Sequence, residues 1–283
     1  MNILSRKVLA LLIFLLIAPV MAAAAQAGEL PSRTGAVMKG VQADGACAIV
    51  GMSAEQCQLT ALQRARASAI EQAAGVSVTS GTLVTNFTVA ADFIKTYARG
   101  FIVAEKVAWL PLGQYQKDTA TAPIPEYRVK ITADVYVPEK KVKPLGLQAR
   151  LNSNVFREGE KARVTVRTTR DAGLAVFNIM ADDRVALLFP HPQETNNRLA
   201  AGKEFIFPAA DSKVELVMQP LSGHQKDAEA LLVIAWEKGQ DIRVMDMFPA
   251  GAPVAFSEFF RTLADIADRC EETILPYEVM AAP

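Results

Sequence analysis

The second half of the chain is divided into short apolar segments by turn-forming residues, and this pattern limits the folds open to it. Residues such as Gly159, Gly173 and Gly202 stand between the segments, which recur at intervals of about 10 to 15 residues. Short strands at such intervals indicate an antiparallel β-sandwich. The expected strands are 148–152, 161–168, 174–181, 185–189, 204–207, 213–218 and 230–237.

The first half mixes helices and strands. Ser53 and Gln56 form a capping box, which predicts a helix that begins there and runs to about residue 74, where Gly75 is placed to end it. A stripe of small residues along this helix would allow close approach to a sheet. The stripe is Cys57, Ala61, Ala65, Ala69 and Ala73.

The expected order of this half is β-α-β-α-β-β. Residues 36–41 form a first strand, which 46–50 either continue or pair with. A strand at 76–84 and a second helix at 88–99 follow. The last two strands, 101–110 and 127–137, are predicted to form a hairpin with a long loop.

A C-terminal helix is expected over residues 257–273. Its apolar face would dock on a domain of this chain or on a partner. That face consists of Phe256, Phe259, Phe260, Leu263, Ile266, Ala267 and Cys270.

The fold class predicted is therefore α+β. Residues 28–138 would form an α+β domain and residues 147–255 a β-sandwich-like domain, followed by a C-terminal helix and tail at 256–283. Residues 139–146 are rich in Lys and bounded by Pro, which indicates a solvated linker, or alternatively a basic contact patch.

The N-terminus predicts export. Arg6 and Lys7 precede an apolar run at 8–20, and small residues lead to an A-x-A site that ends at Ala27. This order is typical of a secretory signal at 1–27, cleaved after Ala27; the alternative is an uncleaved anchor. The rest of the chain has no apolar stretch long enough to span a membrane, so we expect a soluble periplasmic or extracellular protein.

Charge and cysteines add two expectations. The whole chain has 30 basic and 30 acidic residues, so loss of Arg6 and Lys7 leaves a net charge of −2 and gives no electrostatic reason to expect nucleic acid as a partner. In an oxidising compartment Cys47 and Cys57 are predicted to form a disulfide, with Cys270 as the odd thiol; the alternative is that both are small buried residues.

No motif predicts an enzyme, a metal site or a cofactor. His191 and His224 are the two histidines, and Glu194 and Asp227 each follow one by three residues, but in expected loops that spacing does not fix a metal site. A nucleophile elbow and the phosphate-binding glycine motifs are missing from the sequence. Two further sets are explained as ordinary structure: the adjacent carboxylates Asp182, Asp183, Glu271 and Glu272 as solvated pairs, and the aromatic residues Phe87, Trp109, Tyr115 and Trp236 mainly as core rather than sugar-stacking platforms.

Two family resemblances are visible. The helix pattern at 61–78, followed by Gly100-Phe101-Ile102-Val103 and Tyr127-Arg128-Val129, resembles the N-terminal domain of flagellar assembly protein T and exported proteins of the lipoprotein-20 type. Phe156-Arg157-Glu158-Gly159-Glu160, Leu187-Leu188-Phe189-Pro190 and Phe207-Pro208 resemble the DUF4384 family, which implies a β-rich domain in exported proteins and no activity.

The function predicted is a non-enzymatic binding or scaffold module that serves a protein partner in the cell envelope. A partner could bind through an exposed strand edge of the mixed half. Two alternatives are an envelope hydrolase acting on glycan or peptide, which would need a cleft with converging carboxylates or both histidines, and a small-ligand carrier with an apolar pocket between the domains.

Overall fold

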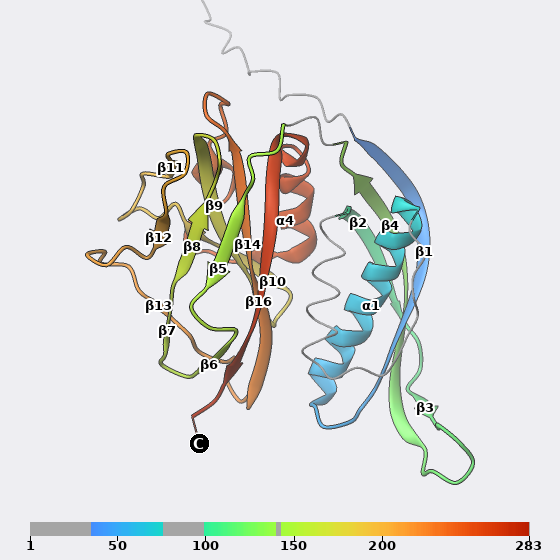
Figure 1. The fold of residues 1–283 in the computed structure, drawn as a ribbon. Helices are drawn as coiled ribbons and strands as arrows, with labels where there is room; N and C mark the ends of the chain where they lie inside the picture. Colours follow the sequence, from blue (N-terminus) through green and yellow to red (C-terminus); the bar gives the residue numbers. More distant parts are fainter. Residues whose placement is uncertain (1–34, 76–98, 140–142, 283) are drawn as a thin grey trace, which may run out of the picture. The chain divides into compact units, whose positions relative to one another are not determined.

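The computed structural model describes residues 35–75, 99–139 and 143–282 of the chain (Figure 1). The expected strand at 76–84 and nearly all of the expected helix at 88–99 lie outside these residues, as does the signal segment. In the described part, no helix is both long and apolar enough to cross a membrane.

The first sheet is antiparallel and has the order β1-β4-β2, with the short β3 beside the start of β4. The predicted hairpin is confirmed, because β2 pairs with β4. Residues 36–41 and 46–48 belong to one strand, which ends at Ala48 and has a register shift between Met38 and Val41. The strands are β1 (Ala36–Ala48), β2 (Phe101–Trp109), β3 (Gly113–Tyr115) and β4 (Ile124–Val137).

Helix α1 (Ala54–Ala74) packs on this sheet through its small residues (Figure 1). The capping box at Ser53 and Gln56 and the left-handed Gly75 at the C-terminal end both form as predicted. Helix and strand approach so closely at Gly45 that a Cβ there would lie 2.0 Å from the Ala61 carbonyl oxygen. The alanine stripe therefore sets the distance between helix and sheet.

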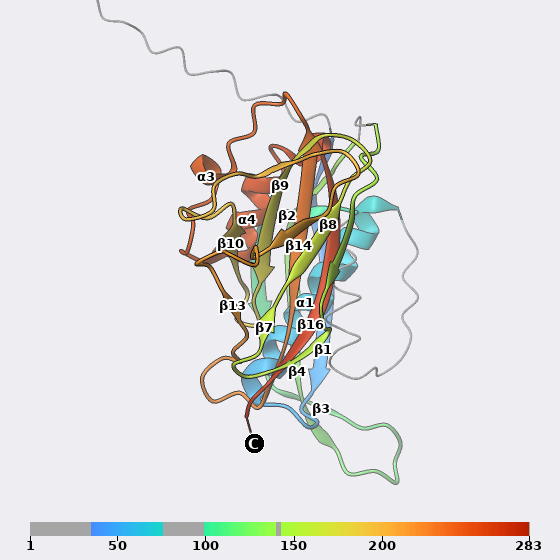
Figure 2. The ribbon, with the colours of Figure 1, turned by 60° about the vertical axis from the view of Figure 1, so that its left-hand side comes forward.

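The second half contains a larger sheet of order β15-β10-β9-β14-β16-β6, in which β16 is Cys270–Met280, and a small sheet of order β12-β8-β5 (Figures 1 and 2). Side chains from both sheets, such as Val166 and Val233, share one apolar cluster, as expected for packed sheets. The strands are β5 (Gln148–Leu151), β6 (Val155–Arg157), β7 (Lys161–Ala162), β8 (Val164–Arg167), β9 (Ala172–Ile179), β10 (Arg184–Phe189), β11 (Arg198–Leu199), β12 (Phe205–Phe207), β13 (Leu216–Val217), β14 (Lys226–Glu237) and β15 (Val254–Ala255).

The predicted C-terminal helix over 257–273 is wrong in its extent. Helix α4 (Phe256–Leu263) stops early, a 3-10 turn (Ala267–Arg269) follows, and β16 (Cys270–Met280) then lies between β14 and β6. The short helix α3 (Val244–Met247) was not predicted. Thr273, Ile274 and Pro276 explain the strand, because β-branched residues favour extended backbone and Pro does not fit inside a helix.

The two halves share a core within the compact unit of residues 31–283. Helix α4 packs against β2, with the Phe101 and Phe260 rings stacked at 5.4 Å between centroids. Arg66 of α1 is 3% exposed and binds two carboxylates, Glu105 of β2 at 2.5 Å and Asp183 of the β9–β10 turn at 2.5 Å. The Arg66 guanidinium also lies over the Phe256 ring at 4.9 Å, so one side chain joins both halves.

Candidate functional site

A cleft of about 370 Å³ lies between the first turns of α1 and the start of β14, and we call it the α1–β14 cleft. Its helix wall presents amide and hydroxyl groups on residues spaced three and four apart, which places them on one face. Its strand wall is the segment 223–228, and Ala181 closes one part. The helix-wall residues are Met52, Ser53, Gln56, Leu59, Thr60 and Gln63.

Gln56 connects the two walls. Its side-chain oxygen accepts a hydrogen bond from the Ser53 N–H at 3.1 Å, and the Ser53 hydroxyl accepts from the Gln56 N–H at 3.1 Å. The side-chain amide of Gln56 then donates to the backbone carbonyl of Lys226 at 3.1 Å. The capping box therefore aims an amide group across the cleft at the backbone of β14.

Alternate residues of β14 point their backbone N–H and C=O groups into this cleft. Ala281 N–H donates to the Gln225 carbonyl at 2.9 Å, so Gln225 faces β16. Glu278, which lies opposite Ala228, donates its N–H to Asn154 on its other side. Because hydrogen-bonding directions alternate along an antiparallel strand, the N–H and C=O groups of Lys226 and Ala228 point away from β16.

Strand β9 does not reach these two residues. Its pairing with β14 begins at Ala230, opposite Ile179, so in the described part of the chain no strand lies beside 226–228 on the cleft side. Continuing that register would place Ala181 opposite Ala228. Instead, Ala181 N–H donates to the Glu229 carboxylate at 3.3 Å, and the backbone leaves the sheet.

Strand β9 ends there because the chain turns into β10, with Met180 N–H donating to the Arg184 carbonyl at 2.8 Å, and a buried network holds Glu229 beside this turn. The Glu229 carboxylate accepts hydrogen bonds from the Tyr277 hydroxyl at 2.6 Å and from the Asn178 amide at 2.9 Å. Burial raises the pKa of Glu229, and these hydrogen bonds act in the opposite direction. Burial likewise raises the pKa of Tyr277 well above its ordinary value, so the phenol remains a donor.

His224 and Asp227 form a second fixed pair at the cleft. His224 Nδ1 lies 2.6 Å from Asp227 Oδ1, and Leu221 N–H donates to the other carboxylate oxygen at 2.6 Å. The Asp227 side chain is 1% exposed, so the carboxylate fixes both the turn and the ring. The pair orients an imidazole at the cleft wall, which could move a proton.

The two histidines predicted from the sequence do not meet. His191 follows β10, whose last residue Phe189 pairs with Val176 and through it with Val233 of β14. His224 lies just before Lys226 at the start of β14, and Lys226 is seven residues from Val233, or about 23 Å at about 3.3 Å per residue. Among the described residues no group of three or more His, Cys, Asp or Glu side chains could hold a metal ion.

The predicted cysteine pair lies together but is not bonded in the structure. Cys57 Sγ donates to the Cys47 carbonyl at 2.9 Å, and both are buried free thiols. The disulfide therefore stays a prediction. Cys270 is buried as expected, but at the start of β16 rather than on a helix.

The aromatic and carboxylate residues considered from the sequence differ in burial and in their partners. Trp236 is buried as expected, whereas Trp109 is 45% exposed, with Tyr127 edge-on at 6.5 Å between ring centroids. Phe87 lies outside the described residues. Asp183 is an ion-pair partner rather than a solvated residue, and the Glu271 carboxylate accepts the N–H groups of Leu145 and Leu147 at 2.5 and 3.1 Å.

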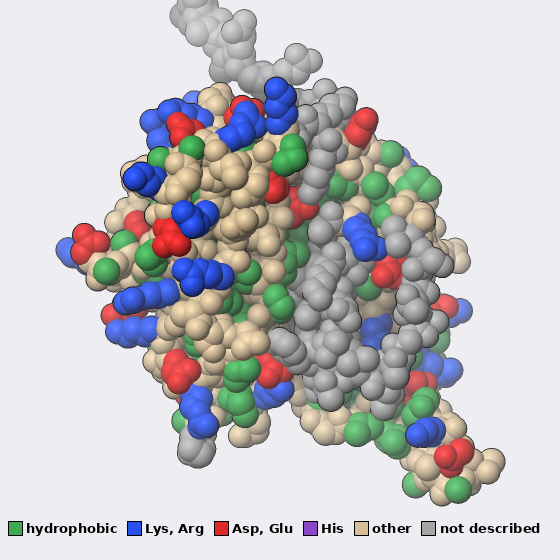
Figure 3. All heavy atoms as spheres, viewed as in Figure 1, with side chains coloured by type: hydrophobic (Ala, Val, Ile, Leu, Met, Phe, Trp, Pro, Cys, Tyr) green, Lys and Arg blue, Asp and Glu red, His purple; other side chains and the backbone are tan. Residues whose placement is uncertain are grey.

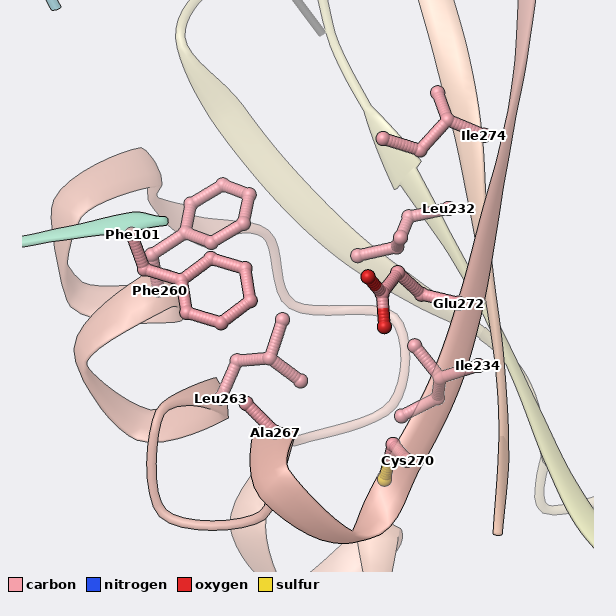
Figure 4. A pocket seen from close by; sticks show the side chains of 9 residues that line it. All are labelled: Phe101, Leu232, Ile234, Phe260, Leu263, Ala267, Cys270, Glu272 and Ile274. Atoms are coloured by element: carbon pink, nitrogen blue, oxygen red, sulfur yellow. The ribbon is translucent and has the colours of Figure 1, made fainter. Parts of the chain in front are cut away.

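An apolar cavity between α4, β2 and the larger sheet is too small for an organic ligand (Figure 4). Phe101, Phe260 and Leu263 face Leu232 and Ile234 across it, and the Glu272 carboxylate points into the gap. Its volume of about 10 Å³ accommodates roughly one water molecule. It gives the small-ligand carrier hypothesis no support.

The face shown in Figure 3 has no broad patch of one charge sign among its described residues. Basic and acidic side chains of the described residues are interspersed over the face in Figure 3. Local sequence patterns do not mark Gln56, Arg66 or Glu229 as residues of the cleft or of the contact between the two halves. Alternation in 226–229, with Asp227 and Glu229 on one face of a strand, was the available signal for the buried polar groups.

The fold and cleft define an α+β protein with a polar groove between a helix and an open strand edge. Residues 155–233 match the family model described as a domain of unknown function, DUF4384. The match confirms the resemblance in the second half, and it includes the 226–228 edge but not α1. No curated protein matches the chain. The resemblance of the first half to flagellar assembly protein T stays a prediction.

Proposed function

We propose that this protein is an exported, non-enzymatic module of the cell envelope that holds a partner protein in the α1–β14 cleft. The observation that carries the proposal is the cleft itself: about 370 Å³, lined by amide, hydroxyl and backbone groups. Polar groups that converge in a formed pocket are the usual mark of a binding site. The signal-like segment at 1–27 supports periplasmic or extracellular localisation after cleavage at Ala27.

Site-specific photo-crosslinking in intact cells tests the proposal. A photo-reactive phenylalanine would replace Gln63 or Gln225 in the cleft, and Gln114 on β3 as the matched control. We expect one discrete crosslinked product from both cleft positions and none from Gln114. Equal crosslinking from all three positions, or none from the cleft, would contradict the proposed site.

A second candidate, an envelope hydrolase, is favoured by one observation. The His224–Asp227 pair resembles the base and orienting carboxylate of a hydrolytic site. Its test is hydrolysis of purified peptidoglycan and of peptide substrates by the mature protein and by His224→Ala. Activity that disappears in this variant would replace the binding proposal with an enzymatic one.

A further inference from the structure

We propose that the occupant of the α1–β14 cleft is a short extended peptide segment, which adds as a strand to the open edge of β14. This inference rests on the proposed function and names the binding mode at the same site. It requires backbone N–H and C=O groups that no neighbouring strand of the described residues pairs with, room beside them, and a wall that suits peptide chemistry.

The edge is provided by Lys226 and Ala228. Their N–H and C=O groups point away from β16, whereas those of Gln225 face it. Residues two apart on a strand repeat every 6.5 to 7 Å, roughly the spacing at which a second strand presents its own groups. An added segment would therefore form the ladder that β9 forms with β14 from Ala230 onward.

Gln56 shows that this edge accepts an amide donor. Its side-chain amide, which is chemically a peptide group, donates to the Lys226 carbonyl at 3.1 Å. Gln63 and Thr60 lie farther along the same helix face. Once a segment replaces the Gln56 amide at Lys226, the side chains of Gln63 and Thr60 could bond its outer edge, and its inner edge would bond β14.

Charge in the cleft favours a neutral segment. Lys226 Nζ is paired with Glu278 at 2.5 Å, and the Asp227 carboxylate is buried against His224 and the Leu221 N–H. The remaining walls include the apolar side chains of Met52, Leu59 and Ala181. A volume of about 370 Å³ suits a stretch of a few small or apolar residues.

The gap beside β14 is built into the fold. Glu229 takes the Ala181 N–H, and Tyr277 and Asn178 fix Glu229 in that position. The chain turns into β10 at the same point, where Met180 N–H donates to the Arg184 carbonyl at 2.8 Å, so among the described residues no strand lies beside β14 where the cleft opens. Binding therefore needs no separation of β9 from β14, but the added segment replaces the Gln56 amide at the Lys226 carbonyl.

Peptide selection and amide exchange test the binding mode. A phage-displayed library of random short peptides would be panned on the full mature protein, and the selected peptide used as the probe. We expect it to slow hydrogen exchange at the Lys226 and Ala228 amides several-fold or more, and to leave Asp227 and Glu229, which face β16, unchanged. Uniform protection across 226–229, or none, would overturn strand addition.

Backbone methylation of the probe supplies a matched control. N-methylation at alternate residues that face β14 should weaken binding about tenfold per lost hydrogen bond, whereas methylation at the intervening residues should have little effect. Ala228→Pro should weaken binding similarly, since it removes a cleft-facing N–H that makes no bond to β16. If this variant fails to fold, amide exchange on the wild-type protein still shows whether the peptide adds as a strand.

The outcomes separate this inference from the proposed function. Crosslinks from Gln63 and Gln225 without alternating protection would retain the cleft as a partner site and reject strand addition. Panning that enriches no peptide dependent on the cleft would also reject it.

Discussion

At the residue scale, Arg66 shows how one side chain can carry the contact between two parts of a chain. Its guanidinium binds Glu105 through Nε and Nη2, and Asp183 through Nη1 and Nη2. Burial raises the pKa of Asp183, and Arg66 opposes that shift. These ion pairs stabilise the folded state only while Arg66, Glu105 and Asp183 are all present.

Arg66→Met should therefore be strongly destabilising. Removing the cation leaves two largely buried carboxylates uncompensated, at a cost of about 3–5 kcal/mol in the free energy of unfolding. Urea denaturation measures it. The control is Arg243→Met, since the Arg243–Asp241 pair is exposed and its loss should change stability by less than about 1 kcal/mol. Equal effects of the two variants on stability would show that Arg66 does not stabilise the contact between the two halves in this way.

Glu229 should give stability a pH dependence. Because burial raises its pKa, the folded state retains a proton that the unfolded state releases above roughly pH 4.3. Stability should then fall as pH rises through that window, by at most about 1.4 kcal/mol per pH unit for this group. Urea titrations at several pH values should show a shallower slope for Glu229→Gln, with Asp183 still contributing. An unchanged slope would show that Glu229 is not the source.

Cys47 and Cys57 are expected to be oxidised in exported protein. Burial raises the pKa of the Cys57 thiol to about 12, so it reacts slowly once folded and should pair with Cys47 before or during folding. In protein purified without reductant and then denatured, one thiol should be titratable, and two in Cys57→Ser. Three thiols in the unmodified chain would reject the disulfide.

At the element scale, the contact of α1 with β1 depends on the absence of a side chain at Gly45. A Cβ there would meet the Ala61 carbonyl oxygen at 2.0 Å and the Ala65 nitrogen at 2.7 Å, both backbone atoms. Gly45→Ala should lower the free energy of unfolding by about 1–3 kcal/mol or more, measured by thermal and urea denaturation. Gly113→Ala is the control, because its Cβ would meet only the flexible Arg128 side chain.

Local signals predicted the elements they directly encode. The Ser53 and Gln56 cap, the Gly75 stop and the alternation in β4 lie within single segments, and each element formed. The expected helix over 257–273 is too long because apolar residues at helical spacing continue as far as Cys270, whereas strand β16 begins at that residue. Pairing with β14 outweighed that pattern.

The cleft itself was beyond local reasoning. Gln56 and Lys226 are 170 residues apart, and Arg66 and Asp183 are 117 apart. A single sequence does not show which distant segments meet. The side chain of Gln56 can therefore be recognised as a helix cap but not as part of the wall of the α1–β14 cleft. The sequence places the expected strand-edge contact in the first half, whereas the edge proposed as a binding site from the structure belongs to β14 in the second half.

At the scale of the whole molecule, the domain boundaries expected from the sequence do not match the connectivity of the core. Residues 147–255 would form a domain without β16, yet β16 lies between β14 and β6 and contributes Tyr277 and Val279 to the core. A fragment of residues 28–269 should therefore lack cooperative unfolding, whereas 28–280 should keep it. Denaturation followed by circular dichroism tests both, and a cooperative transition in the shorter fragment would refute the prediction.

The place of β16 also bears on how the second half folds. Strand β6 joins the larger sheet by pairing with β16, which lies more than 100 residues later in the chain. Contacts of such long range form late in folding. Until β16 docks, the full length of β14 lacks a neighbour on that side, and an uncovered strand edge is where a partly folded chain tends to aggregate.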